Sequence, residues 1–243
     1  MKNQFLAASS AVLLSFFLVS LAIAKPADVS QSFDVSPGGT LSLESDAGSV
    51  EVESHNKNTV EVTVENKSDH DGFNVNFKQS GNDVSIIGER EKNSWMGRST
   101  RIRYMIKVPQ DYNVTLKTGG GSIELSDLNG TADVRTSGGS ISLGKIKGDV
   151  DAKTSGGSIR VDEVSGNIVA HTSGGSIRAT LTKQPTDNCK LTTSGGSVTA
   201  YLASDVAVNV YLKNRGGDVS SDVGGGPELY LKTSGGSVKI KEI

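Results

Sequence analysis

The sequence predicts an all-β protein: a single-stranded parallel β-helix, or β-solenoid, with coils of 18–21 residues and an N-terminal β cap of longer strands. The first observation is a glycine-pair string that recurs at nearly constant spacing in the second half of the chain. The second is the alternation of apolar and polar residues around each glycine pair, which is typical of strands with one buried face. No helical period competes with this alternation after residue 24.

Residues 1–24 are predicted to be a signal peptide. They begin with Lys2, become apolar from Ala11 and end in the small-residue string Ala22-Ile23-Ala24. We therefore expect a bacterial protein that is exported to the periplasm or the cell surface, with a mature chain that starts at Lys25. No later apolar run is long enough to span a membrane, so no transmembrane segment is expected in the mature form.

Charge and cysteine content exclude two further classes of protein. The formal net charge is -2, with no basic excess to neutralise phosphates, so nucleic acid is not an expected partner. Cys189 is the only cysteine, which rules out an intramolecular disulfide. We expect Cys189 to be a buried structural thiol in a fold that is stable without a disulfide.

The repeat is the strongest signal in the chain. TGGGSI starts at Thr118, TSGGSI at Thr136, Thr154 and Thr172, TSGGSV at Thr193 and Thr233, and a degenerate NRGGDV at Asn214. The start-to-start spacings are 18, 18, 18, 21, 21 and 19 residues. Repeats of this length bury their apolar side by stacking on their neighbours, so we expect seven stacked coils between residues 114 and 243.

The glycine pairs are interpreted as structural turns. A tight corner in a strand ladder needs either a positive φ or a close approach of two backbones, and glycine tolerates both because it has no Cβ. The predicted turn glycines are Gly138, Gly139, Gly156, Gly157, Gly174, Gly175, Gly195, Gly196, Gly235 and Gly236.

The remaining mature chain, residues 25–112, is predicted to start the solenoid. A divergent coil begins near Leu41, and longer alternating strands follow as a cap or hairpin insertion. These strands are expected at residues 59–66, 72–79, 82–89 and 101–109. We expect this region to be continuous with the repeats of residues 113–243 as one domain, because the first rung of a solenoid otherwise leaves an open edge.

Three strings in this order carry a family resemblance: FDVSPGGTLSLESDAGSVEV at residues 33–52, YMIKVP at 104–109 and the repeated TSGGS. The chain resembles the bacterial putative-adhesin family of GG-containing β-strand repeats, a domain of unknown function related to the head domain of auto-transporter adhesins. The resemblance covers about residues 30–243. It implies a right-handed coil and export to the cell envelope, and it brings no catalytic or binding residues. Since no translocating barrel follows Ile243, we expect no self-anchoring at the outer membrane.

Catalytic and metal-binding motifs are not evident. No GxSxG string is present, and His55, His70 and His171 lack the spacing of metal ligands. The calcium roll GGxGxDxUx is approximated only by Gly216-Gly217-Asp218. We therefore predict no catalytic residue, no cofactor and no metal site.

One acidic pair keeps an enzyme as the alternative. Asp133 and Asp151 occupy equivalent positions one coil apart, with Arg135, Lys153 and His171 in the neighbouring column. Compensated surface charge is the preferred interpretation. The alternative is a polysaccharide-active β-helix enzyme, a lyase or hydrolase, with these carboxylates in its site.

A candidate contact loop lies in the string EREKNSWMGRSTRIR at residues 89–103. It gathers basic side chains around a tryptophan and a methionine: Arg90, Lys92, Trp95, Met96, Arg98, Arg101 and Arg103. Such a group suits contact with an acidic surface or a glycan. Trp95 packed back over the cap is the structural alternative.

The predicted function is that of an exported, non-enzymatic cell-envelope protein, adhesin-like or a structural scaffold, which presents a rigid β-helical surface. Expected partners are an envelope or surface glycan or another envelope protein. The last repeat, TSGGSVKIKEI, carries no predicted element to cover its final rung. Because an open strand edge can pair, we also expect weak end-to-end self-association.

Overall fold

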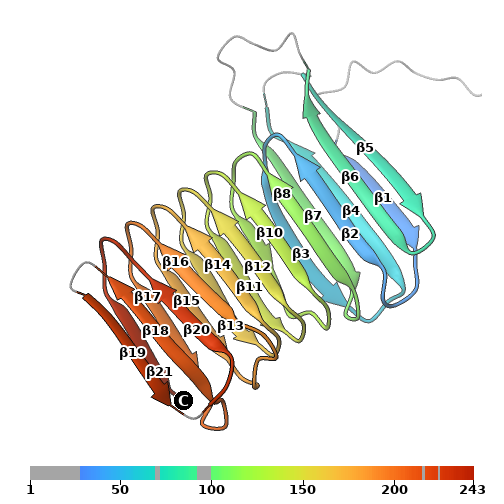
Figure 1. The fold of residues 1–243 in the computed structure, drawn as a ribbon. Helices are drawn as coiled ribbons and strands as arrows, with labels where there is room; N and C mark the ends of the chain where they lie inside the picture. Colours follow the sequence, from blue (N-terminus) through green and yellow to red (C-terminus); the bar gives the residue numbers. More distant parts are fainter. Residues whose placement is uncertain (1–27, 69–71, 92–99, 215–216, 224) are drawn as a thin grey trace, which may run out of the picture.

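The computed structural model describes residues 28–68, 72–91, 100–214, 217–223 and 225–243, with the predicted signal peptide outside these ranges. Two long sheets are stacked face to face, and both extend along the solenoid axis (Figure 1). The described residues contain strands and no helix, which confirms the predicted all-β solenoid. None of them forms a helix long and apolar enough to cross a membrane. The handedness of the coil stays a prediction.

Sheet 1 has ten strands. In spatial order they are β1 (Val29–Asp34), β4 (Thr59–Asn66), β7 (Ile102–Pro109), β3 (Ser49–His55), β9 (Ile123–Leu125), β11 (Ile141–Ile146), β13 (Ile159–Val164), β15 (Ile177–Leu181), β17 (Val198–Leu202) and β21 (Val238–Glu242).

Sheet 2 has eleven strands. In spatial order they are β5 (Phe73–Ser80), β6 (Asp83–Arg90), β2 (Thr40–Ser45), β8 (Asn113–Thr118), β10 (Ala132–Thr136), β12 (Val150–Thr154), β14 (Ile168–Thr172), β16 (Cys189–Thr193), β20 (Glu228–Lys232), β18 (Val208–Asn214) and β19 (Gly217–Val223).

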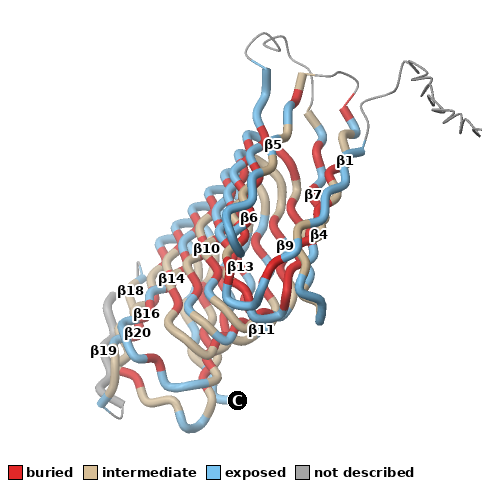
Figure 2. The backbone as a smooth tube through the Cα atoms, turned by 90° about the vertical axis from the view of Figure 1, so that its right-hand side faces the viewer, coloured by how far each residue is buried: buried red, intermediate tan, exposed pale blue. Residues whose placement is uncertain are grey.

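Each regular coil gives one strand to each sheet and pairs in parallel with the coils before and after it. Equivalent residues therefore stack in columns, as Val134, Ala152 and Ala170 do in sheet 2. The alternate side chains point between the sheets, so Ala152 and Ile159 are buried while Arg160 is exposed (Figure 2). The period of two in the sequence thus builds a continuous apolar core, since every coil covers the next.

A column of buried threonines fixes the corner between the two sheets. Each repeat threonine donates its hydroxyl to a glycine carbonyl in the turn of the preceding rung, at 2.6–2.9 Å. The pairs are Thr118 with Gly48, Thr136 with Gly121, Thr154 with Gly139, Thr172 with Gly157, Thr193 with Gly175 and Thr233 with Gly196. A buried hydroxyl and a buried or partly buried carbonyl are thereby satisfied together at every corner.

The predicted turn glycines occupy these corners, but only one of the two expected reasons applies. None of the ten has a positive φ. Instead, the second glycine of each pair lies against the backbone of the preceding turn: a Cβ on Gly157 would meet the Gly139 oxygen at 2.3 Å. The first glycines are less crowded: a Cβ would lie 2.8–3.0 Å from a backbone oxygen at Gly156, Gly174, Gly195 and Gly235, and only at Gly138 would it meet nothing closer than 3.9 Å. Close backbone approach therefore explains the second glycines.

The N-terminal region has the predicted strands, and its rungs are ordered in a way that the sequence did not predict. The rung of β6 and β7 lies outside the rung of β2 and β3 although it comes later in the chain, so β2 pairs with both β6 and β8. The strands β4 and β5 then extend the two sheets beyond this rung as the cap.

The threonine column ends in this cap, where serine and then glycine take the place of the repeat threonine. Gly88 of β6 takes the register position that Ser45 and Thr118 occupy in the next two rungs. The ring of Tyr104 fills the space, with its hydroxyl 2.8 Å from Ser45 Oγ. A Cβ on Gly88 would lie 2.1 Å from the Tyr104 hydroxyl, so glycine is needed there for space.

The prediction that the string at Asn214 forms a coil is wrong. Strands β18 and β19 form an antiparallel hairpin within sheet 2, with Val208 opposite Val223. Regular coils in the second half are therefore six: β8–β9, β10–β11, β12–β13, β14–β15, β16–β17 and β20–β21. Glycine pairs are common in hairpin turns as well as in solenoid corners, which explains why the string imitates a repeat.

The last rung differs between the two sheets. In sheet 2, the hairpin of β18 and β19 follows β20. In sheet 1, β21 is the last strand that the described ranges contain.

The corner geometry predicts that the two glycines of the Gly138-Gly139 pair differ in their tolerance of alanine. Gly139→Ala should lower the free energy of unfolding by about 1–3 kcal/mol, because the added methyl overlaps the carbonyl oxygen of Gly121. Gly138→Ala should cost nothing, because its Cβ position is open. Urea unfolding followed by circular dichroism compares the two, and equal losses would contradict the close-approach explanation.

The buried tyrosine predicts a loss of stability at high pH. Burial raises the pKa of Tyr104 to about 12. The unfolded chain releases this proton near pH 10, so between these values the native state holds more protons and stability falls as pH rises. Tyr104→Phe should flatten this fall in urea titrations at pH 9 to 12, whereas Tyr201→Phe on the outer face should leave it unchanged.

Candidate functional site

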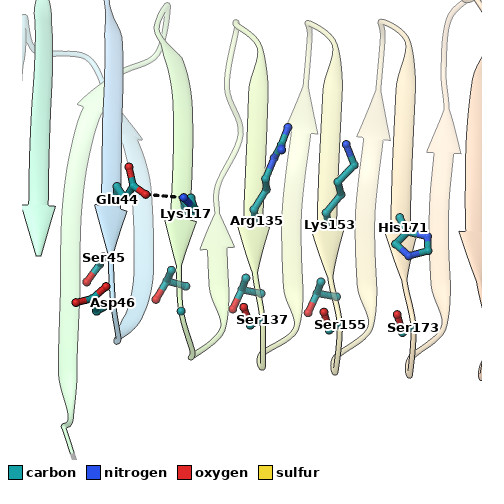
Figure 3. A pocket seen from close by; sticks show the side chains of 14 residues that line it. Glu44, Ser45, Asp46, Lys117, Arg135, Ser137, Lys153, Ser155, His171 and Ser173 are labelled. Atoms are coloured by element: carbon teal, nitrogen blue, oxygen red, sulfur yellow. Dashed lines mark hydrogen bonds and ion pairs between the residues drawn. The ribbon is translucent and has the colours of Figure 1, made fainter. Parts of the chain in front are cut away.

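A groove runs along the corner edge of sheet 2, parallel to the solenoid axis. Its volume is about 340 Å³, and it crosses the ends of β2, β8, β10, β12 and β14 (Figure 3). One wall is a basic row of Lys117, Arg135, Lys153 and His171; the other is a hydroxyl row of Ser137, Ser155 and Ser173. We call this feature the corner groove. Thr118, Thr136 and Thr154 of the buried column line it between the two rows.

The two walls follow from the repeat register. The residue before each repeat threonine points outward because the threonine itself is buried, and the residue after it starts the turn. Parallel pairing sets Lys117, Arg135, Lys153 and His171 in one column. Neighbouring members are therefore about 4.8 Å apart along the axis, and the groove offers a basic side chain and a serine hydroxyl at the three coils of β10, β12 and β14.

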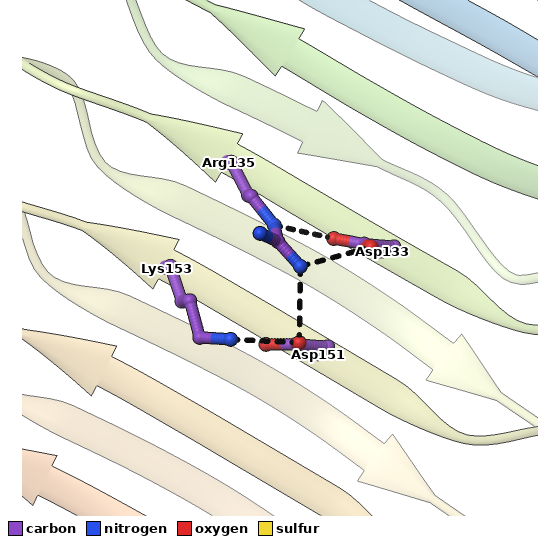
Figure 4. Close-up of polar contacts among 4 residues, drawn as sticks. All are labelled: Asp133, Arg135, Asp151 and Lys153. Atoms are coloured by element: carbon purple, nitrogen blue, oxygen red, sulfur yellow. Dashed lines mark hydrogen bonds and ion pairs between the residues drawn. The ribbon is translucent and has the colours of Figure 1, made fainter.

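Ion pairs compensate most of the basic row. Lys117 Nζ lies 2.5 Å from Glu44 Oε1, and Lys153 Nζ lies 2.8 Å from Asp151 Oδ2. The guanidinium of Arg135 bridges two carboxylates, at 2.9 Å from Asp133 and 3.3 Å from Asp151 (Figure 4). The hydrogen bonds that Arg135 donates to Asp133 raise the pKa of Arg135 above its ordinary value. The groove thus combines fixed donors and acceptors with little net charge.

The predicted acidic pair lies where the sequence placed it. Asp133 and Asp151 are directly opposite each other in β10 and β12. Both hold Arg135, and Asp151 also holds Lys153, which is the arrangement that compensated surface charge requires. One oxygen of Asp151, Oδ1, is buried and makes no hydrogen bond within the described part of the structure.

A second hollow of about 330 Å³ lies at the opposite end of the same strands. Asp149 and Asp187 join the acidic pair there, but their oxygens already accept backbone hydrogen bonds from Asn167 and Asn188, each at 2.7 Å. The described ranges contain no group of three or more His, Cys, Asp or Glu side chains that could hold a metal ion.

The candidate contact loop is described only at its two ends. Lys92, Trp95, Met96 and Arg98 lie outside the described residues. Arg90 ends β6, Arg101 precedes β7, and Arg103 lies on the outer face of sheet 1, 2.7 Å from Glu51. That hydrogen bond raises the pKa of Arg103. Arg103 therefore belongs to an ion pair on the other sheet, away from the corner groove.

The loop leaves sheet 2 beside the groove. It joins β6 to β7 at the corner where other rungs have a glycine pair. The backbone nitrogen of Arg90 donates to Asp46 Oδ2 at 3.0 Å, and Asp46 lines the end of the groove. The start of the predicted contact loop and the corner groove are therefore contiguous on one edge.

Histidine and cysteine residues occupy separate places. His55 lies 2.8 Å from the carbonyl oxygen of Thr59, and His171 lies 2.8 Å from Thr192 Oγ1 in the groove wall, whereas His70 is outside the described residues. Cys189 is buried, as predicted, and burial raises the pKa of its thiol. Its sulfur accepts a hydrogen bond from the backbone of Ile168.

Sequence reasoning missed the corner groove although the repeat contains its signal. The positions directly before and after each repeat threonine, aligned coil by coil, give the basic row and the hydroxyl row.

Comparison with known families gives one match. The model of the Toastrack DUF4097 family matches residues 39–162, which is just over half of the chain. The matched segment runs from the first coil to β13 and includes most of the groove. No curated protein matches the chain significantly.

Solved structures give distant likenesses. A putative cell adhesion protein from Clostridium sporogenes is 13% identical, with 89% of this chain and 100% of that chain covered and a TM-score of 0.42. A putative adhesin from Bacteroides fragilis is 12% identical, with 90% and 98% covered and a TM-score of 0.38.

The ion pairs beside the groove should contribute little to stability. Asp133→Asn and Asp151→Asn should each change the free energy of unfolding by less than about 1 kcal/mol, because these pairs are open to solvent. Thr154→Val should cost more, about 1–3 kcal/mol, because it leaves the partly buried Gly139 carbonyl without the Thr154 hydroxyl as its donor. Urea unfolding measures all three, and a larger loss for either aspartate variant would contradict this ranking.

Proposed function

The chain belongs to the Toastrack DUF4097 family, and on that premise we propose that it is an exported, non-enzymatic scaffold of the bacterial cell envelope. Within that family we place it among the adhesin-like proteins with glycine-pair repeats, on the strength of its TSGGS strings. Its task is contact: the solenoid holds a rigid, regular surface against a glycan or against another envelope protein.

The corner groove is the observation that carries this proposal. It repeats one set of hydrogen-bonding groups at the three coils of β10, β12 and β14, with a basic side chain on one wall and a serine hydroxyl on the other. A linear ligand made of similar units can meet the same contacts again and again along such a groove. Polysaccharides have this repeated, hydroxyl-rich chemistry, so a glycan chain lying along the axis is the preferred ligand.

Two features of the surroundings support contact over catalysis. Of the two carboxylates that line the groove, Glu44 is paired with Lys117 and Asp46 accepts a hydrogen bond from the backbone of Arg90. Asp133 and Asp151 beside the groove are engaged in ion pairs, so none of the four is poised as a free acid or base. The loop of residues 91–101, with its tryptophan and arginines, leaves β6 at the end of the groove and suits an additional contact with the same ligand.

A polysaccharide-active enzyme remains the second candidate because Asp133 and Asp151 lie opposite each other in neighbouring strands. In that case one carboxylate would have to leave its basic partner to act as an acid, base or nucleophile.

The proposal is tested by incubating residues 25–243 with an array of envelope and host glycans, including anionic polysaccharides. Retained glycan and released reducing ends are both measured. We expect retention without cleavage. Ser155→Leu, which fills the groove, should weaken binding at least about tenfold. Ser142→Leu is the matched control, because it adds the same side chain to an exposed position on sheet 1.

Three other results would change the assignment. Cleavage that is lost in Asp133→Asn or Asp151→Asn would establish the enzyme. Binding that survives Ser155→Leu but is lost in Trp95→Ala would move the contact to the loop. Neither binding nor cleavage would leave a structural role with a protein partner.

A further inference from the structure

The carboxyl-terminal end of the solenoid is stepped. Strands β20 and β21 belong to the same coil and end the regular stack. Sheet 2 continues beyond β20 with β18 and β19, whereas no described strand follows β21 in sheet 1 (Figure 1). One sheet thus extends beyond the other by two strands, or about 10 Å.

The step leaves core-type side chains half-covered. Val210 and Leu212 of β18, and Val238 and Ile240 of β21, pack against the apolar core but stay partly exposed. Their neighbours one strand inward, such as Leu231 beside Leu212 and Ala200 beside Ile240, are fully buried. The outer edge of β21 and the inward-facing side of β18 therefore carry apolar side chains typical of a protein core. Nothing in the described part of the chain covers them.

The step is complementary to itself. A two-fold axis parallel to the strands exchanges the two sheets and reverses the solenoid axis. The two-strand extension of each copy then fills the two-strand deficit of the other. On each side the order becomes β21 of one copy, followed by β19, β18 and β20 of its partner, so that both sheets continue without a gap.

Strand direction and charge agree with this arrangement. The chain reverses at the corner between β20 and β21, and again between β18 and β19, so β21 and β19 run the same way. The outward positions of β21 hold Lys239 and Lys241. Strand β19 has Asp218 and Asp222 in register with Lys213 and Asn209 of β18. An acidic strand would thus lie beside a basic one at both contacts.

We propose that the chain forms a closed two-fold dimer through its carboxyl-terminal ends, with β21 of each copy paired to β19 of the other. The partner is a second copy because the surface fits itself, which is the condition for an isologous contact. This goes beyond the proposed contact function, since it concerns the opposite end of the molecule from the candidate contact loop.

The first test is the association of residues 25–243 measured by sedimentation equilibrium. We expect a monomer–dimer equilibrium with no larger species. Lys239→Glu combined with Lys241→Glu should weaken the dimer at least about tenfold, because acidic strands would then meet. Adding Asp218→Lys and Asp222→Lys should restore it. Arg160→Glu combined with Arg178→Glu, on the same face but in inner coils, is the matched control and should change nothing.

Hydrogen exchange locates the contact independently of these variants. Raising the protein concentration should slow amide exchange in β21 and in the hairpin of β18 and β19, and leave the N-terminal edge strands β1 and β5 unchanged. A monomer at about 1 mM would overturn the proposal. So would open-ended growth beyond a dimer, concentration-dependent protection at β1 or β5, or a dimer indifferent to the charge reversals.

Discussion

The hydrogen bond from each repeat threonine to a glycine carbonyl of the preceding turn is the interaction on which the rest of the structure depends. It brings one corner so close to the next that a Cβ on the second glycine would lie about 2.3 Å from a carbonyl oxygen. That approach sets the register of successive coils, and register decides which residues stack. The continuous core, the basic row and the hydroxyl row are all consequences of one corner repeated.

Sequence patterns predicted the features that depend on residues close in the sequence or on identical neighbouring coils. The period of two gave the strands, and the repeat gave the stacking, because both are set by neighbours in the sequence or by identical neighbours in space. The order of the first rungs is different: β6 pairs with β2 through residues more than forty positions apart, and no pattern in either strand selects that partner. The hairpin at Asn214 was mistaken for a coil because glycine pairs suit both kinds of turn.

The candidate site shows the same division. The opposition of Asp133 and Asp151 followed from the repeat spacing, and the structure adds the bridging guanidinium that a sequence cannot orient. The position of the contact loop was less accessible, since it depends on the rung to which β6 belongs. Once β6 is placed beside β2, Arg90 comes next to Asp46, and a loop that seemed separate from the repeats begins at the end of their groove.

The proposed dimer bears on the proposed contact function through geometry alone. A two-fold axis parallel to the strands exchanges the sheets but keeps every glycine corner on the same edge of the assembly. The two corner grooves, and the loops that leave β6, would then open along one edge with their directions reversed. A polymer or a surface that meets that edge could engage both copies at once, and the second engagement would benefit from the high effective concentration created by the first. Modest contacts at each coil would in that way add up to firm attachment, which is what a scaffold without a deep pocket requires.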